Sequence, residues 1–180
     1  MCTKGLTVSL LLSATLLLAV SFRASAQKVS AGALFSPKGC GVIVSVPAAG
    51  GECRATFEGL LDLNGVLLGK TRRPGGMLRF FYDYTFFHRS CGDSPAEFSL
   101  YAGPGAMVGY VRDRDGIFGP AAALSGEFGM AYSPLPCFKV SLGFNVDLGL
   151  HFDVDDSKTR IYLAGLTRVW MPQIALMYCF

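Results

Sequence analysis

The sequence predicts an all-β protein, an antiparallel eight-stranded transmembrane β-barrel, from its alternating strands, its signal peptide and the size of the remaining chain. The clearest strand is residues 137–153, where the even positions from Phe138 to Phe152 are all apolar. The odd positions from Lys139 to His151 are polar or glycine, so the two faces of one extended strand favour opposite surroundings. At about 3.4 Å per residue the stretch reaches roughly 50 Å, enough to cross a bilayer at a tilt.

A signal peptide is predicted over residues 1–26. Lys4 gives a positive start, residues 6–20 are apolar, and Ala24-Ser25-Ala26 forms a cleavage site. Cleavage removes the two cations Lys4 and Arg23 and no acid, so the formal charge falls from +3 to +1. What remains, residues 27–180, has the size of one domain, and its balanced charge gives no support to a nucleic-acid partner.

The first strands are short. Residues 29–36 and 41–46 are β-prone runs around Pro37-Lys38-Gly39, and residues 47–51 form a flexible break. The third predicted strand, residues 53–68, places apolar side chains such as Phe57 on one face and charged ones on the other.

The fourth predicted strand, residues 77–89, has an aromatic outer face, while Arg79 and Asp83 turn the other way. A basic loop, residues 69–76, precedes it, and residues 91–95 read as a tight turn.

The fifth and sixth predicted strands, residues 96–112 and 118–132, repeat the alternation with Gly, Ser and Glu on the polar side. Residues 113–116 turn the chain between them, and residues 133–136 lead into the strand at 137–153. A long charged loop is expected after Asp153 as far as Trp170, and residues 173–180 form the last strand. Glycines inside the strands disfavour helix.

A soluble barrel, apolar inside and polar outside, is the alternative architecture. Its wet face would carry frequent Lys, Glu and Thr, whereas here the polar faces are mostly Gly, Ser and Asn with isolated charges. Aromatic residues also gather near the strand ends, as in the two interfacial girdles of a membrane barrel. One group is Phe98, Tyr132, Phe138 and Tyr178, and the other is Tyr110, Phe118, Phe152 and Trp170.

The sheet is expected to close into a barrel, because the hydrocarbon of a bilayer offers no partner for backbone polar groups at an open sheet edge. The recognisable strands and the even-number rule of bacterial barrels point to eight. Side chains nearly fill so narrow a barrel, so the inward charges are expected to form a paired network that plugs the lumen. The residues assigned to this network are Arg54, Glu58, Asp62, Arg79, Asp83, Glu97, Glu127, Lys139 and Asp147.

Five cysteines remain after cleavage, without any C-x-x-C pair. This pattern argues against a dense disulfide framework and against a cysteine-rich metal site. One bridge is compatible with an oxidising periplasm, and the sequence does not say which. The five are Cys40, Cys53, Cys91, Cys137 and Cys179.

The signal peptide, the alternating strands and the closing residues 173–180, QIALMYCF, resemble those of small outer-membrane β-barrel proteins of Gram-negative bacteria. The resemblance covers essentially the whole mature chain and implies a location in the cell outer membrane. It also implies that the terminal Phe180 belongs to the signature read by the barrel assembly machinery. Residues 101–116 and 165–180 further resemble an uncharacterised group of short barrels, which brings no activity. Cys179 stands where a polar or basic residue is more usual.

One stretch has the spacing of a catalytic motif. Residues 88–90, His-Arg-Ser, resemble the His and Ser spacing of outer-membrane lipid A deacylases. The Asn expected next is Cys91, and the topology puts the three residues at the periplasmic end, away from outer-leaflet lipid. An ordinary strand end is the better interpretation.

A calcium loop is suggested by Asp153, Asp155 and Ser157. Lys158 stands at the sixth position instead of Gly, and Ala164 at the twelfth instead of Glu, which argues against it. No cofactor and no metal is expected.

One hypothesis is that some of the basic residues in the outer loops contact lipopolysaccharide phosphates, and the alternative is that they form a solvated loop surface. They are Lys70, Arg72, Arg73, Arg112, Arg114, Lys158, Arg160 and Arg168. The function expected is structural or surface-interacting, without catalysis. A narrow small-solute pore and a lipid A-modifying enzyme are the alternatives.

Overall fold

The computed structural model describes residues 29–48, 51–63, 74–90, 96–112, 118–154, 158–164 and 171–180. The predicted signal peptide, residues 1–26, lies outside these residues. The described strands are β1 (Ser30–Ser36), β2 (Gly39–Ala48), β3 (Cys53–Asp62), β4 (Gly75–Ser90), β5 (Glu97–Arg112), β6 (Phe118–Leu135), β7 (Phe138–Asp153), β8 (Lys158–Ala164) and β9 (Met171–Cys179). No helix in this described part of the chain is long and apolar enough to cross a membrane.

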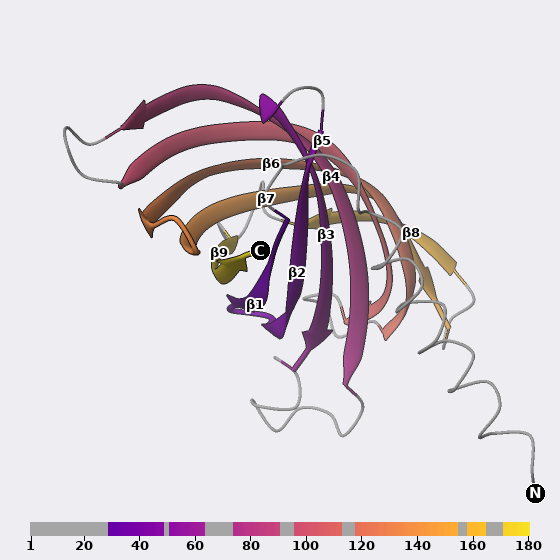
Figure 1. Cartoon of the computed structure of the whole chain (residues 1–180). Helices are drawn as coiled ribbons and strands as arrows, with labels where there is room; N and C mark the ends of the chain where they lie inside the picture. The colour runs from indigo at the N-terminus through magenta and orange to yellow at the C-terminus, as the bar shows by residue number, and fades with distance from the viewer. Residues whose placement is uncertain are drawn as a thin grey trace, which may run out of the picture.

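The strands form one antiparallel sheet that closes on itself. From β1 to β7 each strand pairs with the next, β9 pairs with both β7 and β1, and these pairings make a ring of eight (Figure 1). Both chain ends of the barrel lie together, because Ser30 pairs with Cys179. The predicted eight-stranded antiparallel barrel is therefore confirmed.

The eighth position of the ring is shared by two strands. β7 pairs with β9 from Phe138 to Asn145 and with β8 from Asp147 to Asp153. The expectation of a long loop from residue 154 to 170 was therefore wrong. Lys158 and Arg160 gave this stretch the look of a loop, but its later residues keep the two-residue alternation of a strand: Tyr162 is buried and Ile161 is exposed.

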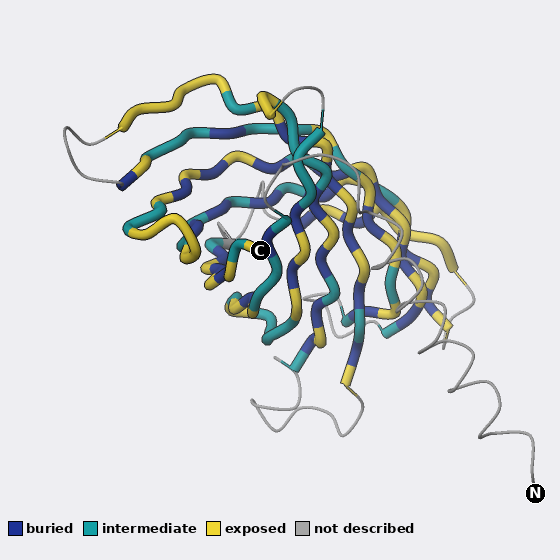
Figure 2. The backbone as a smooth tube through the Cα atoms, viewed as in Figure 1, coloured by how far each residue is buried: buried dark blue, intermediate teal, exposed yellow. Residues whose placement is uncertain are grey.

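Apolar side chains cover the outside of the barrel and polar ones line the inside. Along the strands buried and exposed residues alternate one by one (Figure 2). On β6, Leu124 is 75% exposed, whereas its neighbour Ser125 is 7% exposed. Buried polar residues and exposed large apolar ones are the reverse of a soluble protein. The exterior is the lipid-facing surface of a transmembrane barrel, because water would make so much exposed apolar area unfavourable.

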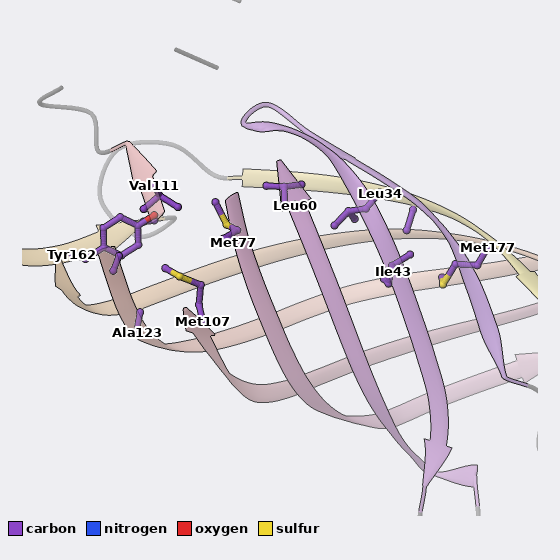
Figure 3. Close-up of a cluster of buried hydrophobic side chains, with 12 residues drawn as sticks. Leu34, Ile43, Leu60, Met77, Met107, Val111, Ala123, Tyr162 and Met177 are labelled. Atoms are coloured by element: carbon purple, nitrogen blue, oxygen red, sulfur yellow. The ribbon is translucent and has the colours of Figure 1, made fainter. Parts of the chain in front are cut away.

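The interior also contains an apolar cluster that the alternation of polar and apolar residues did not predict (Figure 3). Most of its members lie toward the barrel end that carries the β1–β2 and β5–β6 connections. They are Leu34, Ile43, Leu60, Met77, Met107, Val111, Ala121, Ala123, Tyr162, Ala164, Ala175 and Met177. Side chains therefore pack this part of the lumen as they pack a protein core.

Candidate functional site

Arg79 on β4 lies at the centre of the polar lumen. The β3–β4 register places Glu58 directly opposite it, and Arg79 Nη1 lies 3.8 Å from Glu58 Oε2. Its other terminal nitrogen, Nη2, donates a 2.7 Å hydrogen bond to Asp147 Oδ2 on β7. β4 and β7 are not neighbours in the ring, so this ion pair crosses the interior of the barrel.

Neutral side chains add hydrogen bonds to these charged groups. Ser125 Oγ on β6 donates to Asp147 Oδ1 at 2.6 Å, and the register places the two residues opposite each other. Gln173 Nε2 on β9 donates to Glu58 Oε1 at 2.6 Å and to Glu127 Oε1 at 3.3 Å. These hydrogen bonds give Asp147, Glu58 and Glu127 one neutral donor each, which offsets part of the cost of burying a carboxylate.

A second cluster continues the network toward the end of the barrel where β1 begins and β9 ends. Tyr101 OH donates to Glu127 Oε1 at 3.2 Å, and the Arg54 guanidinium lies 4.0 Å from the centre of the Tyr101 ring. Thr56 Oγ1 donates to Asp83 Oδ2 at 2.7 Å. The register pairs Arg54 with Asp83, so a cation faces this carboxylate as well.

The predicted network residues fall into three positions. Six of them are buried in the lumen: Glu58, Asp62, Arg79, Asp83, Glu127 and Asp147. Arg54 and Lys139 are half-buried, and Glu97 is exposed. Asp62 lies apart from the others, where its Oδ2 accepts the backbone N–H of Arg112 at 3.4 Å.

Arg54, Glu97 and Lys139 line a cavity of about 320 Å³ at the end of the barrel where β1 begins and β9 ends. Ser30 and Cys179 also contribute to its wall. Beyond this mouth the polar network and the apolar cluster occupy the lumen. The cavity is a vestibule next to these buried residues.

Neutral network members are the residues that sequence reasoning missed. Tyr101, Ser125 and Gln173 carry no charge, so nothing marked them beyond their place on the inward face. The available signal was strand alternation, because residues an even number of positions apart share a face. Tyr101 lies four residues from Glu97, Ser125 two from Glu127, and Gln173 two from Ala175.

The basic residues proposed for lipopolysaccharide are only partly within the described chain. Lys158 and Arg160 lie on β8 and not in a loop, and the Arg160 side chain is 47% exposed with its Nη2 3.8 Å from Asp153 Oδ2. Arg112 ends β5 and is half-buried. Five others lie outside the described residues: Lys70, Arg72, Arg73, Arg114 and Arg168.

Two further motifs can be placed. Residues 88–90 are the exposed last residues of β4, at the end of the barrel where β1 begins and β9 ends. Asp155 and Ser157 of the suggested calcium loop lie outside the described residues. Among the residues that the structure describes, no cluster of metal ligands occurs.

The last residue, Phe180, lies at the surface. Its backbone N–H donates to Val29 O at 2.8 Å, which ties the two ends of the barrel chain together. The Phe180 ring lies 5.1 Å from that of Tyr178, and Phe180 is 75% exposed. The terminal aromatic side chain is therefore presented outward.

Comparison with known proteins gives matches among solved structures alone. No protein-family model matches the sequence, and no curated protein matches it. The fold is similar to that of a major outer membrane protein from Thermus thermophilus, at 15% identity and a TM-score of 0.45, covering 87% of this chain and 100% of that one. It is also similar to Neisserial surface protein A, at 12% identity and a TM-score of 0.37, covering 85% of this chain and 92% of that one.

Proposed function

We propose that the chain is a small outer-membrane β-barrel protein of a Gram-negative cell, with a structural or surface-interaction role and without catalysis. The apolar exterior and the closed antiparallel ring support the membrane setting, because open sheet edges are not tolerated in hydrocarbon. The barrel lies in the outer membrane with both chain ends toward the periplasm, the arrangement typical of such barrels.

The lumen is closed by side chains. The observation that carries this is the contact from Arg79 on β4 to Asp147 on β7, which crosses the interior between non-adjacent strands. Glu58 and Gln173 extend the same bonded group to β3 and β9. In an eight-stranded barrel the interior is only wide enough for side chains, so this network leaves no water-filled path.

Planar-bilayer recording tests the closed lumen. Purified protein inserted into a bilayer should give no discrete conductance steps, while a large porin in the same bilayer gives them. Stable open steps from the unaltered protein would favour the narrow-pore alternative and overturn the closed lumen.

A lipid-modifying activity is the alternative of a different class. Its candidate site is the exposed strand end at residues 88–90, which this orientation places at the periplasmic side. Mass spectrometry of lipid A from cells with and without the protein should show the same species. A new deacylated species would contradict a non-catalytic role.

The partners of this barrel are membrane lipid, lipopolysaccharide and the barrel assembly machinery. Arg160 and Lys158 are exposed near the outer end and carry the charge that phosphate groups would meet. Phe180 is exposed at the end of β9, where the assembly machinery is expected to read it. Replacing Phe180 with Ala should lower the amount of folded protein in the outer membrane, and unchanged assembly would contradict this role.

A further inference from the structure

Two cysteines face each other at the periplasmic end of the barrel. β7 and β9 pair with Phe138 opposite Tyr178, and the next step of this register places Cys137 opposite Cys179. A backbone hydrogen bond confirms the step, since Cys179 N–H donates to Cys137 O at 2.9 Å. Residues 42 positions apart in the chain (179 − 137) are thus cross-strand neighbours.

Both thiols belong to one face of the sheet, because directly opposed residues of antiparallel strands project to the same side. Side chains two residues apart on a strand share a face. Lys139, two residues after Cys137, lines the vestibule, and Met177, two residues before Cys179, is buried within the lumen. Cys179 itself also lines the vestibule. An opposed pair with this hydrogen bonding has a Cα separation of about 5.5 Å, which lies within the range of about 4.4–6.8 Å found in disulfides.

The surroundings allow the small adjustment that bonding needs. The Cβ atoms of opposed residues lie about 4.5–5.5 Å apart, and a disulfide brings them to about 3.5–4.5 Å. Cys137 belongs to the two-residue turn between β6 and β7, and Cys179 is the last residue of β9. Strand ends move more easily than strand centres, so the two Cβ atoms can approach without disturbing the ring.

We propose that Cys137 and Cys179 form a disulfide bond that fastens the last strand of the barrel to the β6–β7 turn. Among the described cysteines no other two are opposed: Cys40 pairs with Leu61 and Phe35, and Cys53 with Ala48 and Tyr84. The proposal rests on the proposed function for its compartment, because the periplasm is where disulfides form and persist.

The oxidant is a periplasmic protein disulfide of the thiol-oxidase class. One of the two thiols, as thiolate, attacks a sulfur of that disulfide, breaks its S–S bond and forms a mixed disulfide. The second thiol then displaces the oxidant and forms the Cys137–Cys179 bond. Two S–H bonds of the barrel are lost, the oxidant leaves as a dithiol, and the two electrons pass to it. Cys137 is exposed, so the first attack is open to it.

Purified protein folded in detergent tests the geometry without reference to the cell. In a variant with Cys40, Cys53 and Cys91 replaced by Ser, oxidised glutathione should make both remaining thiols resistant to maleimide, and mass spectrometry should find their peptides linked. A matched variant keeps Cys40 and Cys53 and replaces the other three, and mass spectrometry should find no link between its two cysteine peptides. Full alkylation of Cys137 and Cys179 in the folded protein would overturn the proposal.

The same variants, expressed in cells and trapped with maleimide before fractionation, test the compartment. The bond should be present in the outer-membrane fraction of the Cys137/Cys179 variant. Reduced thiols in correctly located protein would contradict the bond in the cell. If the bond forms in detergent and the cellular protein lies outside the outer membrane, the proposed location fails while the geometric inference stands.

Discussion

Arg79 and Asp147 join non-adjacent strands of the barrel wall, with Arg79 Nη2 2.7 Å from Asp147 Oδ2 and side chains only 4% and 1% exposed. They come from β4 and β7, which share no backbone pairing. An ion pair so far from water is sensitive to the loss of either partner, because the remaining charge is buried without compensation. The stability of the barrel should therefore depend on this contact more than on any surface ion pair.

Replacing Arg79 with Met should destabilise the barrel by about 3–5 kcal/mol, since Asp147 and Glu58 then lose their cation. Urea unfolding in detergent, followed by the shift between folded and unfolded bands on unheated gels, measures this. The matched control is Arg160→Met, which removes a half-exposed partner of Asp153 and should cost less than about 1 kcal/mol. Equal effects of the two substitutions would count against a buried cross-lumen pair.

Charge on the lipid face should be costly at mid-membrane depth. Leu124 lies in the middle of β6 and points outward, so Leu124→Arg should destabilise the folded barrel by about 2–4 kcal/mol in lipid vesicles. Val154 is exposed just beyond the end of β7, and Val154→Arg should cost about 0–1 kcal/mol. A soluble barrel would tolerate both changes alike, and that result would be incompatible with the transmembrane assignment.

Gly129 of β6, which faces the lumen, tests how tightly the lumen is filled, and Gly126 on the outward face of the same strand is the control. A Cβ added at Gly129 would lie 2.5 Å from Tyr101 Cζ and 2.8 Å from Leu142 O, whereas one at Gly126 would meet nothing within 4 Å. Gly129→Ala should therefore destabilise the barrel by about 1–3 kcal/mol, and Gly126→Ala should be nearly neutral. The temperature at which the folded band is lost on gels, compared with that of the unaltered protein, measures the destabilisation of each variant. Tolerance at Gly129 would mean a looser interior than described.

The alternation of residue types was sufficient to predict most of the strands and which face of each strand points toward lipid. It worked best on long strands such as β7, where one apolar face runs unbroken from Phe138 to Phe152. It failed at β8, because the strand is short and opens with Lys158 and Arg160. Local patterns of charge there favoured a loop, while pairing with β7 decided the structure.

The inward direction of Arg79 and Asp147 was foreseeable, but their pairing was not. Parity along each strand assigns Arg79 and Asp147 to the lumen. It does not say which residues meet across it, because these two are 68 positions apart and their contact depends on how the ring closes. Parity also places the neutral residues Gln173 and Ser125 on the inward face, but it does not say which charges they contact.

The proposed lipopolysaccharide contacts predict that reversing basic charge weakens lipopolysaccharide binding. A variant with Arg72, Arg73 and Arg160 changed to Glu should retain severalfold less lipopolysaccharide through purification in detergent, because charge-assisted contacts to phosphate become repulsive. Arg89→Glu is the control, since Arg89 is exposed at the opposite end of the barrel. Unchanged retention in the triple variant would dispose of this interaction.

The central claim, apolar side chains toward lipid and a packed interior, is tested most directly by footprinting the unaltered protein in vesicles. A diazirine dissolved in the lipid, activated by light, inserts into side chains that contact hydrocarbon, and mass spectrometry locates the adducts. Leu124 and Leu148 should be labelled, while the equally apolar Leu34 and Met107, which are buried, should stay unlabelled. Equal labelling of these two pairs of residues would contradict the account.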